Sequence, residues 1–470
     1  MLRIGMAAEA ESLDPPNFRI SSDLIRADLI FDGLVDAAAD GTIVPALATE
    51  WAPVDETTWE FKLREGVTFH DGESLDAAAV ETSLERAAAA DQGSAYLGVL
   101  EDVEVVDDLT VRLHLERPYA AILNNLTVPV AGIQSPAALA EHGDDVSRHP
   151  VGTGPFQFVE WQLDTKLVLA ANPDYWGGAP ALDRVEFIPI PEASTRLSAL
   201  RTGSLEVIEN PSPDEIPGLG SSGLAAVVEP KARPIFLGFN VEEIPDVRVR
   251  TAIAMALDKE AIVDAVLEGL GTPATESLVT PEFRGEAAAV GIAYDPDGAK
   301  ALLEEAGATG LSLRVVLPTE RYLRDTAVME VIQAQLAEVG ITLELDIRDS
   351  GAWYQALLDR DTELYWLGWG LNSYDPGDLF TRVFATGAVN NMSQLAAPDV
   401  DALVGELESA AVGSEERAAI VSELERLVVE EHVAVVPIYH SKNLFAVAAD
   451  VEGFHTTPGE MLDLSATTVG

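Results

Sequence analysis

The chain has 470 residues and a formal net charge of −50, because it carries 79 Asp and Glu residues against 29 Lys and Arg residues. A surface of this charge repels phosphates, which excludes nucleic acid as a partner. The absence of cysteine excludes disulfides, thiol catalysis and cysteine-ligated metals. At this length we expect two or more lobes, because a single hydrophobic core stops growing well below it.

Apolar periodicity switches repeatedly between the strand and helix patterns, which predicts mixed α/β lobes. Asp258 and Ser414 stand where N-caps are expected, and Gly269 and Gly340 stand where helices end. The elements predicted in chain order are strands at 57–63 and 109–115, helices at 259–268 and 327–339, a strand at 341–347 and a helix at 415–431.

Several other residues suggest structural roles. Gly66, Gly72 and Gly154 stand where tight turns need freedom in φ. Tyr175 and Trp176 are expected to pack a corner of a lobe, and the Pro-, Gly- and Ser-rich stretch 210–223 is predicted to be a long exposed loop.

Sequence motifs for catalysis are missing. The chain has no Gly-x-Ser-x-Gly, no His-Glu-x-x-His, no phosphate loop and no Gly-x-Gly-x-x-Gly after a strand, and its seven histidines include no pair at i, i+4. We therefore expect neither an enzyme nor a cofactor nor a metal site.

The segment 365–376 is the strongest candidate for ligand contact. An apolar strand runs into two glycines, and such glycines expose backbone N–H and C=O groups. Trp369 and Tyr374 offer flat amphipathic surfaces for an extended ligand. The predicted contacts are Trp369, Gly370, Asn372, Tyr374 and Asp375.

Eight phrases in a fixed order resemble the family of extracellular solute-binding proteins that serve peptide and nickel importers. They are SLDP at 12–15, FDGL at 31–34, PALA at 45–48 with the stretch 59–72, GTGPF at 152–156, NPDYWGG at 172–178, DVRVRTAI at 246–253, YD at 294–295 with AKALL at 299–303, and GW at 368–369 before DP at 375–376.

The resemblance implies a two-lobed periplasmic-binding-protein fold of class II, a Venus flytrap with an extra subdomain in lobe I. Lobe I would comprise 1–240 and 438–470, with the subdomain at about 37–150, and lobe II would comprise 241–437. The hinge would lie near Phe239–Asn240 and Pro437–Tyr439. A ligand bound between the lobes would then favour the closed state.

The resemblance also implies a function and further site residues. The chain would be the extracytoplasmic receptor of an ABC importer that delivers a short peptide to a permease with its ATPase subunits, acting as a monomer. The N-terminal loop with Asn17 and Arg19 would lie near the ligand. Where peptide-binding relatives carry an aspartate for the ligand's α-ammonium, this chain has Asn372, and the nickel-contacting histidine has no counterpart in 377–394.

Alternatives stay open at this point: a nickel-chelate or other small-solute receptor of the same family, or a sensor or chaperone-like binding protein. No stretch approaches the ~20 apolar residues that cross a bilayer. The first residues lack the pattern of a signal peptide, so a signal or membrane tether that was removed ahead of Met1 is also left open.

The charge predicts salt-dependent stability. Only six of the basic residues are lysines, and acidic excess with few lysines is typical of a halophilic protein. Salt screens the self-repulsion, because the screening length falls from ~10 Å at 0.1 M to ~3 Å at 1 M. Thermal unfolding should show a clearly higher melting temperature in about 2 M than in about 0.1 M KCl. Equal melting temperatures would contradict the halophilic interpretation, whereas a small rise is expected from salting-out of any protein.

Overall fold

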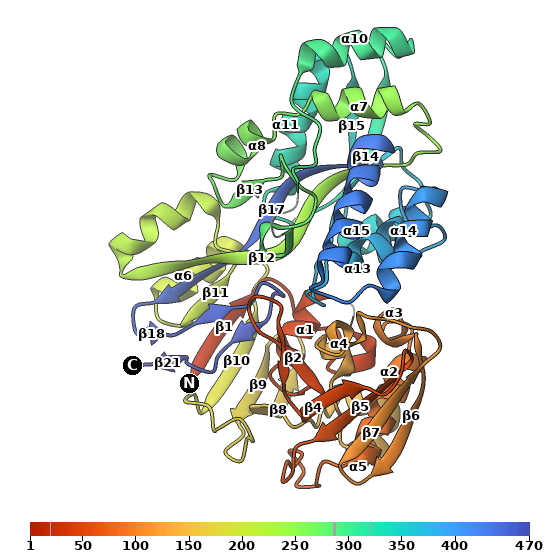
Figure 1. The fold of residues 1–470 in the computed structure, drawn as a ribbon. Coiled ribbons are helices and arrows are strands. Elements are labelled where there is room, and N and C mark those ends of the chain that lie inside the picture. Colours follow the sequence, from red (N-terminus) through yellow and green to blue (C-terminus); the bar gives the residue numbers. More distant parts are fainter. Residues whose placement is uncertain (19, 285–287, 320) are drawn as a thin grey trace. The chain divides into compact units, whose positions relative to one another are not determined.

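The computed structural model describes residues 1–18, 20–284, 288–319 and 321–470, which form two compact units (Figure 1). Unit 1 comprises Met1–Glu229, Asn372–Tyr374 and Asn443–Gly470. Unit 2 comprises Pro230–Leu371 and Asp375–Lys442. The short segment Asn372–Tyr374 is therefore a part of unit 1 that the chain enters from unit 2 and leaves again.

Two long strands carry the main crossings between the units. Unit boundaries fall inside β12 (Leu224–Phe239) and between residues 442 and 443 of β17 (Val435–Ala448). The predicted hinge segments Phe239–Asn240 and Pro437–Tyr439 both lie within unit 2. Strand β17 pairs with β13 on the unit 2 side of its boundary and with β11 on the unit 1 side. The hinge near Phe239–Asn240 and Pro437–Tyr439 stays a prediction.

The main sheet of unit 1 is built around the first strand of the chain. Its strands, in spatial order, are β17, β11 (Val207–Glu209), β1 (Leu2–Met6), β10 (Arg184–Pro189), β9 (Lys166–Ala171) and β8 (Phe156–Gln162). Strand β1 pairs in parallel with β10 and β11. Leu2, Ile4 and Met6 are fully buried in the core of this unit.

A second sheet lies within the range predicted for the subdomain. Its antiparallel strands, in spatial order, are β4 (Ala48–Pro53), β5 (Thr58–Leu63), β7 (Thr110–Leu115) and β6 (Leu100–Asp107). Phe61 and Leu113 are buried together with residues of helix α2 (Ala77–Ala89). Glu60 and Arg112 form an ion pair that is partly exposed. The alternation predicted for 57–63 and 109–115 is therefore confirmed.

Three family phrases in unit 1 meet at one carboxylate. Asp32 accepts hydrogen bonds from the Thr153 hydroxyl at 2.6 Å, the Tyr175 hydroxyl at 3.0 Å and the Trp176 indole N–H at 2.9 Å. Burial raises the pKa of Asp32, and these three donors partly offset the rise. Tyr175 and Trp176 thus hold segments of unit 1 together.

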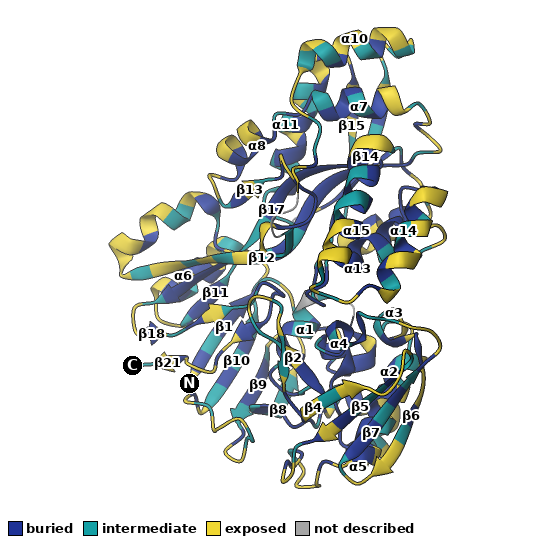
Figure 2. Cartoon of the chain, in the orientation of Figure 1, coloured by how far each residue is buried: buried dark blue, intermediate teal, exposed yellow. Residues whose placement is uncertain are grey.

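The sheet of unit 2 is covered on both faces. Its strands, in spatial order, are β15 (Thr342–Arg348), β14 (Ser312–Pro318), β16 (Leu364–Gly368), β12 and β17, with β13 (Gly271–Pro273) on β17. Ile235 and Trp366 point into one apolar cluster, while Phe236 and Tyr365 point into another. Strand β16 and the paired part of β12 are therefore buried on both faces, as Figure 2 shows.

Helices supply these two clusters from opposite sides. The first cluster contains residues of α7 (Val247–Met255), α8 (Lys259–Val266), α10 (Pro296–Ala306) and α11 (Asp325–Glu338). The second contains residues of α12 (Ser350–Leu358), α14 (Pro398–Ser409) and α15 (Glu415–Arg426).

The local signals in unit 2 were read correctly. Asp258 caps α8 by accepting from the N–H of Ala261 at 2.9 Å, and Ser414 caps α15 by accepting from the N–H of Arg417 at 3.1 Å. Gly340 has a φ of +85°, as expected after a helix.

The predicted loop 210–223 instead contains a 3₁₀ helix at Pro213–Ser222, which begins with proline at its first position. Within the described residues no helix is long and apolar enough to span a bilayer.

The predicted glycine turns divide into two cases. Gly66 and Gly72 have φ values of +76° and +89°, so their conformational freedom is used. The prediction that Gly154 serves a tight turn is wrong, because Gly154 does not have a positive φ. A Cβ there would lie 2.6 Å from the carbonyl carbon of Ile30 and 2.8 Å from the carbonyl oxygen of Leu29. Gly154 is therefore required for close backbone approach.

Gly154→Ala should lower the free energy of unfolding by about 1–3 kcal/mol, because backbone atoms of another segment cannot move aside cheaply. The matched control is Gly405→Ala in α14, where a Cβ meets nothing within 4 Å. That variant should gain up to about 1 kcal/mol in helix propensity. Urea unfolding of both variants measures the difference, and equal effects would refute the packing argument.

Candidate ligand-binding site

The candidate site begins where β16 ends. Strand pairing with β12 continues past Gly368: the N–H of Trp369 donates to the carbonyl of Pro234 at 3.2 Å, and the N–H of Leu371 donates to that of Ala232 at 2.8 Å. The backbone donors of Trp369 and Leu371 are therefore used within unit 2. Because N–H groups alternate along a strand, those of Gly368 and Gly370 point to the opposite side.

Gly368 is closed off by a tyrosine. Its N–H donates to the Tyr322 hydroxyl at 2.9 Å, and that hydroxyl donates to the Gly368 carbonyl at 3.3 Å. A Cβ on Gly368 would lie 2.3 Å from Cδ1 of Ile235 and 3.0 Å from the Tyr322 ring. Gly368 is thus explained by packing, whereas the N–H of Gly370 has no partner among the described residues.

Trp369 is partly exposed and lies against the apolar cluster of unit 2 that contains Phe236, Tyr365 and Leu371. One part of the ring is supported by the protein and another part is open. Such a ring is held in place while it still offers a surface. Trp369 and Gly370 thus keep groups that are available to a ligand.

Asn372 and Tyr374 are bound within unit 1. The side-chain N–H of Asn372 donates to the carbonyl of Gly459 at 2.9 Å. Tyr374 has a φ of +57° and is 8% exposed. Burial is the main cause that raises its pKa to about 12. A Cβ on Gly459 would lie 2.7 Å from the Tyr374 hydroxyl, so the two residues are in close contact.

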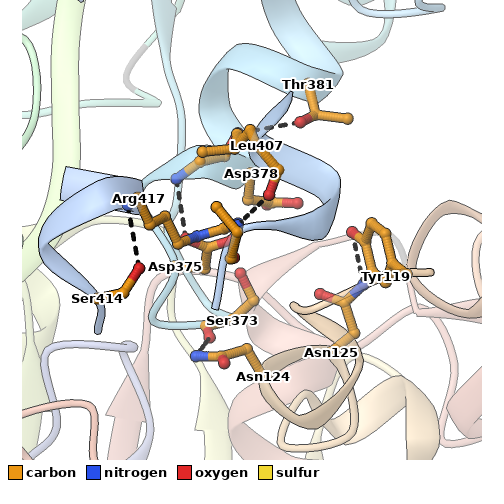
Figure 3. A network of polar contacts seen from close by, with 12 residues as sticks. Tyr119, Asn124, Asn125, Ser373, Asp375, Asp378, Thr381, Leu407, Ser414 and Arg417 are labelled. Carbon is orange, nitrogen blue, oxygen red and sulfur yellow. Dashed lines mark hydrogen bonds and ion pairs between the residues drawn. The ribbon is translucent and has the colours of Figure 1, made fainter. Parts of the chain in front are cut away.

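The backbone between them is held too. The carbonyl of Ser373 accepts from the side-chain amide of Asn124 at 3.0 Å, as Figure 3 shows. Both residues are buried. The segment Asn372–Tyr374 therefore has structural partners on each of its three residues.

Asp375 has a structural partner as well. Its side chain is 2% exposed and that of Arg417 is 5% exposed. Arg417 donates through Nε to Oδ1 of Asp375 at 3.1 Å and through Nη2 to Oδ2 (Figure 3). The N–H of Gly377 also donates to Oδ1 at 3.0 Å. Both carboxylate oxygens of Asp375 therefore have partners within unit 2, and we predict that the residue anchors the loop rather than contacting the ligand.

The N-terminal residues contribute one described position. Asn17 is exposed at the end of a 3₁₀ helix, Pro15–Asn17, and its side-chain N–H donates to Oδ2 of Asp14 at 2.6 Å. Asp14 is itself paired with Arg86 at 2.6 and 2.7 Å. Arg19 lies outside the described residues.

Sequence reasoning did not single out Tyr322, which contacts Gly368, or Asp325, which holds the backbone of Tyr322. Asp325 accepts from the backbone N–H groups of Arg321 at 3.0 Å and Tyr322 at 2.8 Å, and from the indole N–H of Trp366 at 2.7 Å. Its side chain is almost fully buried, and burial raises its pKa to about 7. The only sequence signal was an aspartate at the start of a helical run, which is ordinary for a helix N-terminus.

No described group of three or more His, Asp or Glu side chains is arranged to hold a metal ion. Among the described residues, the site offers the N–H of Gly370, which has no partner there, beside the partly exposed ring of Trp369. A two-unit α/β chain with such a loop is compatible with the class of solute-binding proteins.

Comparison with known proteins specifies the family. Residues 42–391 match the model of the bacterial extracellular solute-binding proteins, family 5, and the chain belongs to this family. It is therefore an extracellular binding protein and not an enzyme.

Two characterised relatives resemble most of the chain. The glutathione-binding protein GsiB of Pectobacterium atrosepticum is 30% identical over 416 residues, which are 85% of this chain and 80% of the relative. The dipeptide-binding protein of Escherichia coli K12 is 31% identical over 380 residues, which are 74% and 71% of the two chains. The dipeptide-binding protein of Pseudoalteromonas sp. SM9913, solved with Met-Leu, has the same fold, with a TM-score of 0.89, 23% identity and full coverage of both chains.

Asp375→Asn tests the anchoring role. Breaking a buried ion pair leaves an uncompensated charge on Arg417, which should lower the free energy of unfolding by about 3–5 kcal/mol. The control Glu423→Gln breaks the exposed pair with Arg426 and should change stability little. Urea unfolding of both variants provides the measurement. A stable Asp375→Asn protein with impaired ligand binding would return Asp375 to the binding site.

Proposed function

We propose that this chain is the substrate-binding receptor of an ABC importer and that it captures a short peptide outside the cytoplasm. A membrane permease and its ATPase subunits would receive the ligand. The observation that carries the choice of ligand is the resemblance, at 30% and 31% identity, to proteins named for binding glutathione and dipeptides. Peptide therefore takes precedence over the nickel chelate among the ligands open to this family.

The geometry of unit 2 supports an extended ligand. The free N–H of Gly370 follows β16 on the side that faces away from β12, so a peptide carbonyl can accept from it as a neighbouring strand would. Trp369 lies next to this donor and provides an apolar surface for a side chain. One backbone hydrogen bond and one aromatic contact recognise a peptide with little regard to its sequence.

The α-ammonium of such a peptide would be held differently from the family pattern. Asn372 replaces the expected aspartate, and its amide N–H already donates to Gly459. An aspartate at this position would place a carboxylate oxygen against a carbonyl oxygen. Asn372 is therefore a structural residue in this proposal, and charge-assisted capture of the α-ammonium at residue 372 is not part of it.

Transport follows from a shift in population. A ligand that contacts both lobes favours the closed receptor, since only that state makes both sets of contacts. We further propose that the receptor is a monomer in a salt-rich environment, in line with the net charge of −50 and the shortage of lysine. A tether that holds it at the membrane is an additional part of the proposal.

Trp369→Ala should weaken binding of alanine di- and tripeptides by about 2 kcal/mol or more, as is typical for an aromatic anchor. The matched control is Trp59→Ala, which removes another partly buried tryptophan, packed on the core of the four-stranded sheet. Both variants should lose some stability, but only Trp369→Ala should lose affinity in isothermal titration. Unchanged affinity in Trp369→Ala would place the ligand elsewhere, and failure of every peptide to bind the parent protein would refute the peptide proposal.

A further inference from the structure

A short segment of unit 2 contacts Gly368 through Tyr322, although none of its residues was predicted to bind the ligand. Residues 321–324 lie between β14, which ends at Pro318, and α11, which begins at Asp325, and Arg324 has a φ of +53° just before the helix. This left-handed turn precedes Asp325, whose carboxylate accepts from the N–H groups of Arg321 and Tyr322. The remaining oxygen of Asp325 accepts from Trp366 on β16, so the segment is attached to the strand that leads into the site.

This attachment fixes the position of the Tyr322 hydroxyl. The hydroxyl bonds to both the N–H and the carbonyl of Gly368 and also accepts from Nε of Arg321 at 3.3 Å. A backbone unit of a neighbouring strand would make the same pair of contacts to Gly368. Tyr322 therefore occupies the place that the next residue of an extended ligand would take.

The side of β16 that faces β14 shows how many backbone groups remain for a ligand. Strand β14 pairs with β16 only through Val315 with Leu364 and Val316 with Tyr365. Beyond that pairing, the N–H groups on the same side belong to Gly368, which donates to Tyr322, and to Gly370, which has no partner in the part of the chain that the structure describes. A ligand that runs along this edge meets Tyr322 directly after Gly370.

We propose that Tyr322, positioned by Asp325, is a stop that ends ligand pairing along β16 at Gly370 and so restricts the receptor to short peptides. Asp325 touches no ligand and acts through the backbone of residues 321 and 322. The inference rests on the proposed function, because it assumes that a peptide lies along Gly370.

The stop has a pH dependence that follows from its geometry. Burial raises the pKa of Asp325 to about 7, while Arg321 lowers it, and the facing Tyr439 has its own pKa raised by burial and by the charge of Asp325. Ionised Asp325 accepts the three N–H donors strongly, whereas the protonated carboxyl accepts them weakly. The position of Tyr322 is therefore held more strongly above pH 7, where Asp325 is ionised, than below it.

The experiment compares di-, tri- and tetraalanine by isothermal titration at about pH 6 and about pH 8 with the parent protein and with Tyr322→Phe, Tyr322→Ala and Asp325→Asn. The parent protein at the higher pH should gain no affinity beyond the dipeptide. Tyr322→Phe frees the N–H and carbonyl of Gly368, and Tyr322→Ala also removes the ring. Both variants should raise the affinity for tetraalanine relative to dialanine by about tenfold, the value of one good hydrogen bond.

Asp325→Asn should shift the length preference in the same direction and should abolish its change between the two pH values. Glu425→Gln is the matched control, because Glu425 is also a buried carboxylate with a raised pKa. It accepts from the N–H groups of Leu278 and Val279 and from the Ser277 hydroxyl. This control should lose stability and keep both the length preference and its pH dependence.

The outcomes separate this inference from the function on which it rests. If peptides bind and Trp369→Ala weakens all lengths, but both Tyr322 variants keep the parent's length preference, the stop is refuted and the proposed function stands. If Asp325→Asn and Glu425→Gln behave alike, Asp325 has only a stabilising role. If no alanine peptide binds the parent protein, both proposals fall.

Discussion

The buried ion pair between Asp375 and Arg417 is the interaction on which the conformation of the candidate loop depends. After β16 the chain contributes Asn372–Tyr374 to unit 1 and returns to unit 2 at Asp375. Arg417 is itself fixed, since its Nη1 donates to the carbonyls of Leu407 and Ala410. Loss of either partner would leave a charge buried without compensation, so the return point of the loop is strongly specified.

The carboxylate of Asp325, which bonds to Trp366 on the strand before the loop, has a different kind of partner. Whereas Asp375 pairs with a guanidinium group, Asp325 accepts hydrogen bonds from two backbone N–H groups and one indole N–H. Its pKa is raised from 3.8 to about 7, so the folded state binds a proton that the unfolded state releases in this range. Folding stability from this group is therefore present below its ordinary pKa and declines as the pH rises toward 7. In the proposed receptor, correct positioning of Tyr322 is obtained at this cost in stability.

Chain-local signals were sufficient for the elements that the sequence predicted. Helix caps at Asp258 and Ser414, the glycine after α11 and the alternation in β5 and β7 all depend on neighbours within a few residues. The family phrases also pointed to the correct family, and Asp32 shows why some of them recur together: its partners come from residues 121, 143 and 144 positions further along the chain. The reason for Gly154 was misjudged because the atoms it approaches belong to Leu29 and Ile30.

Sequence reasoning therefore established the α/β class and the family, because composition, periodicity and ordered motifs are properties of the chain itself, and it proposed the candidate loop. Which polar groups of that loop already have partners within the protein was decided only by the fold. Asp375, Asn372 and Gly368 are taken by partners 42, 87 and 46 residues away in sequence. No local pattern encodes such distances, since burial and hydrogen-bond satisfaction are set by whichever distant segment packs against the loop.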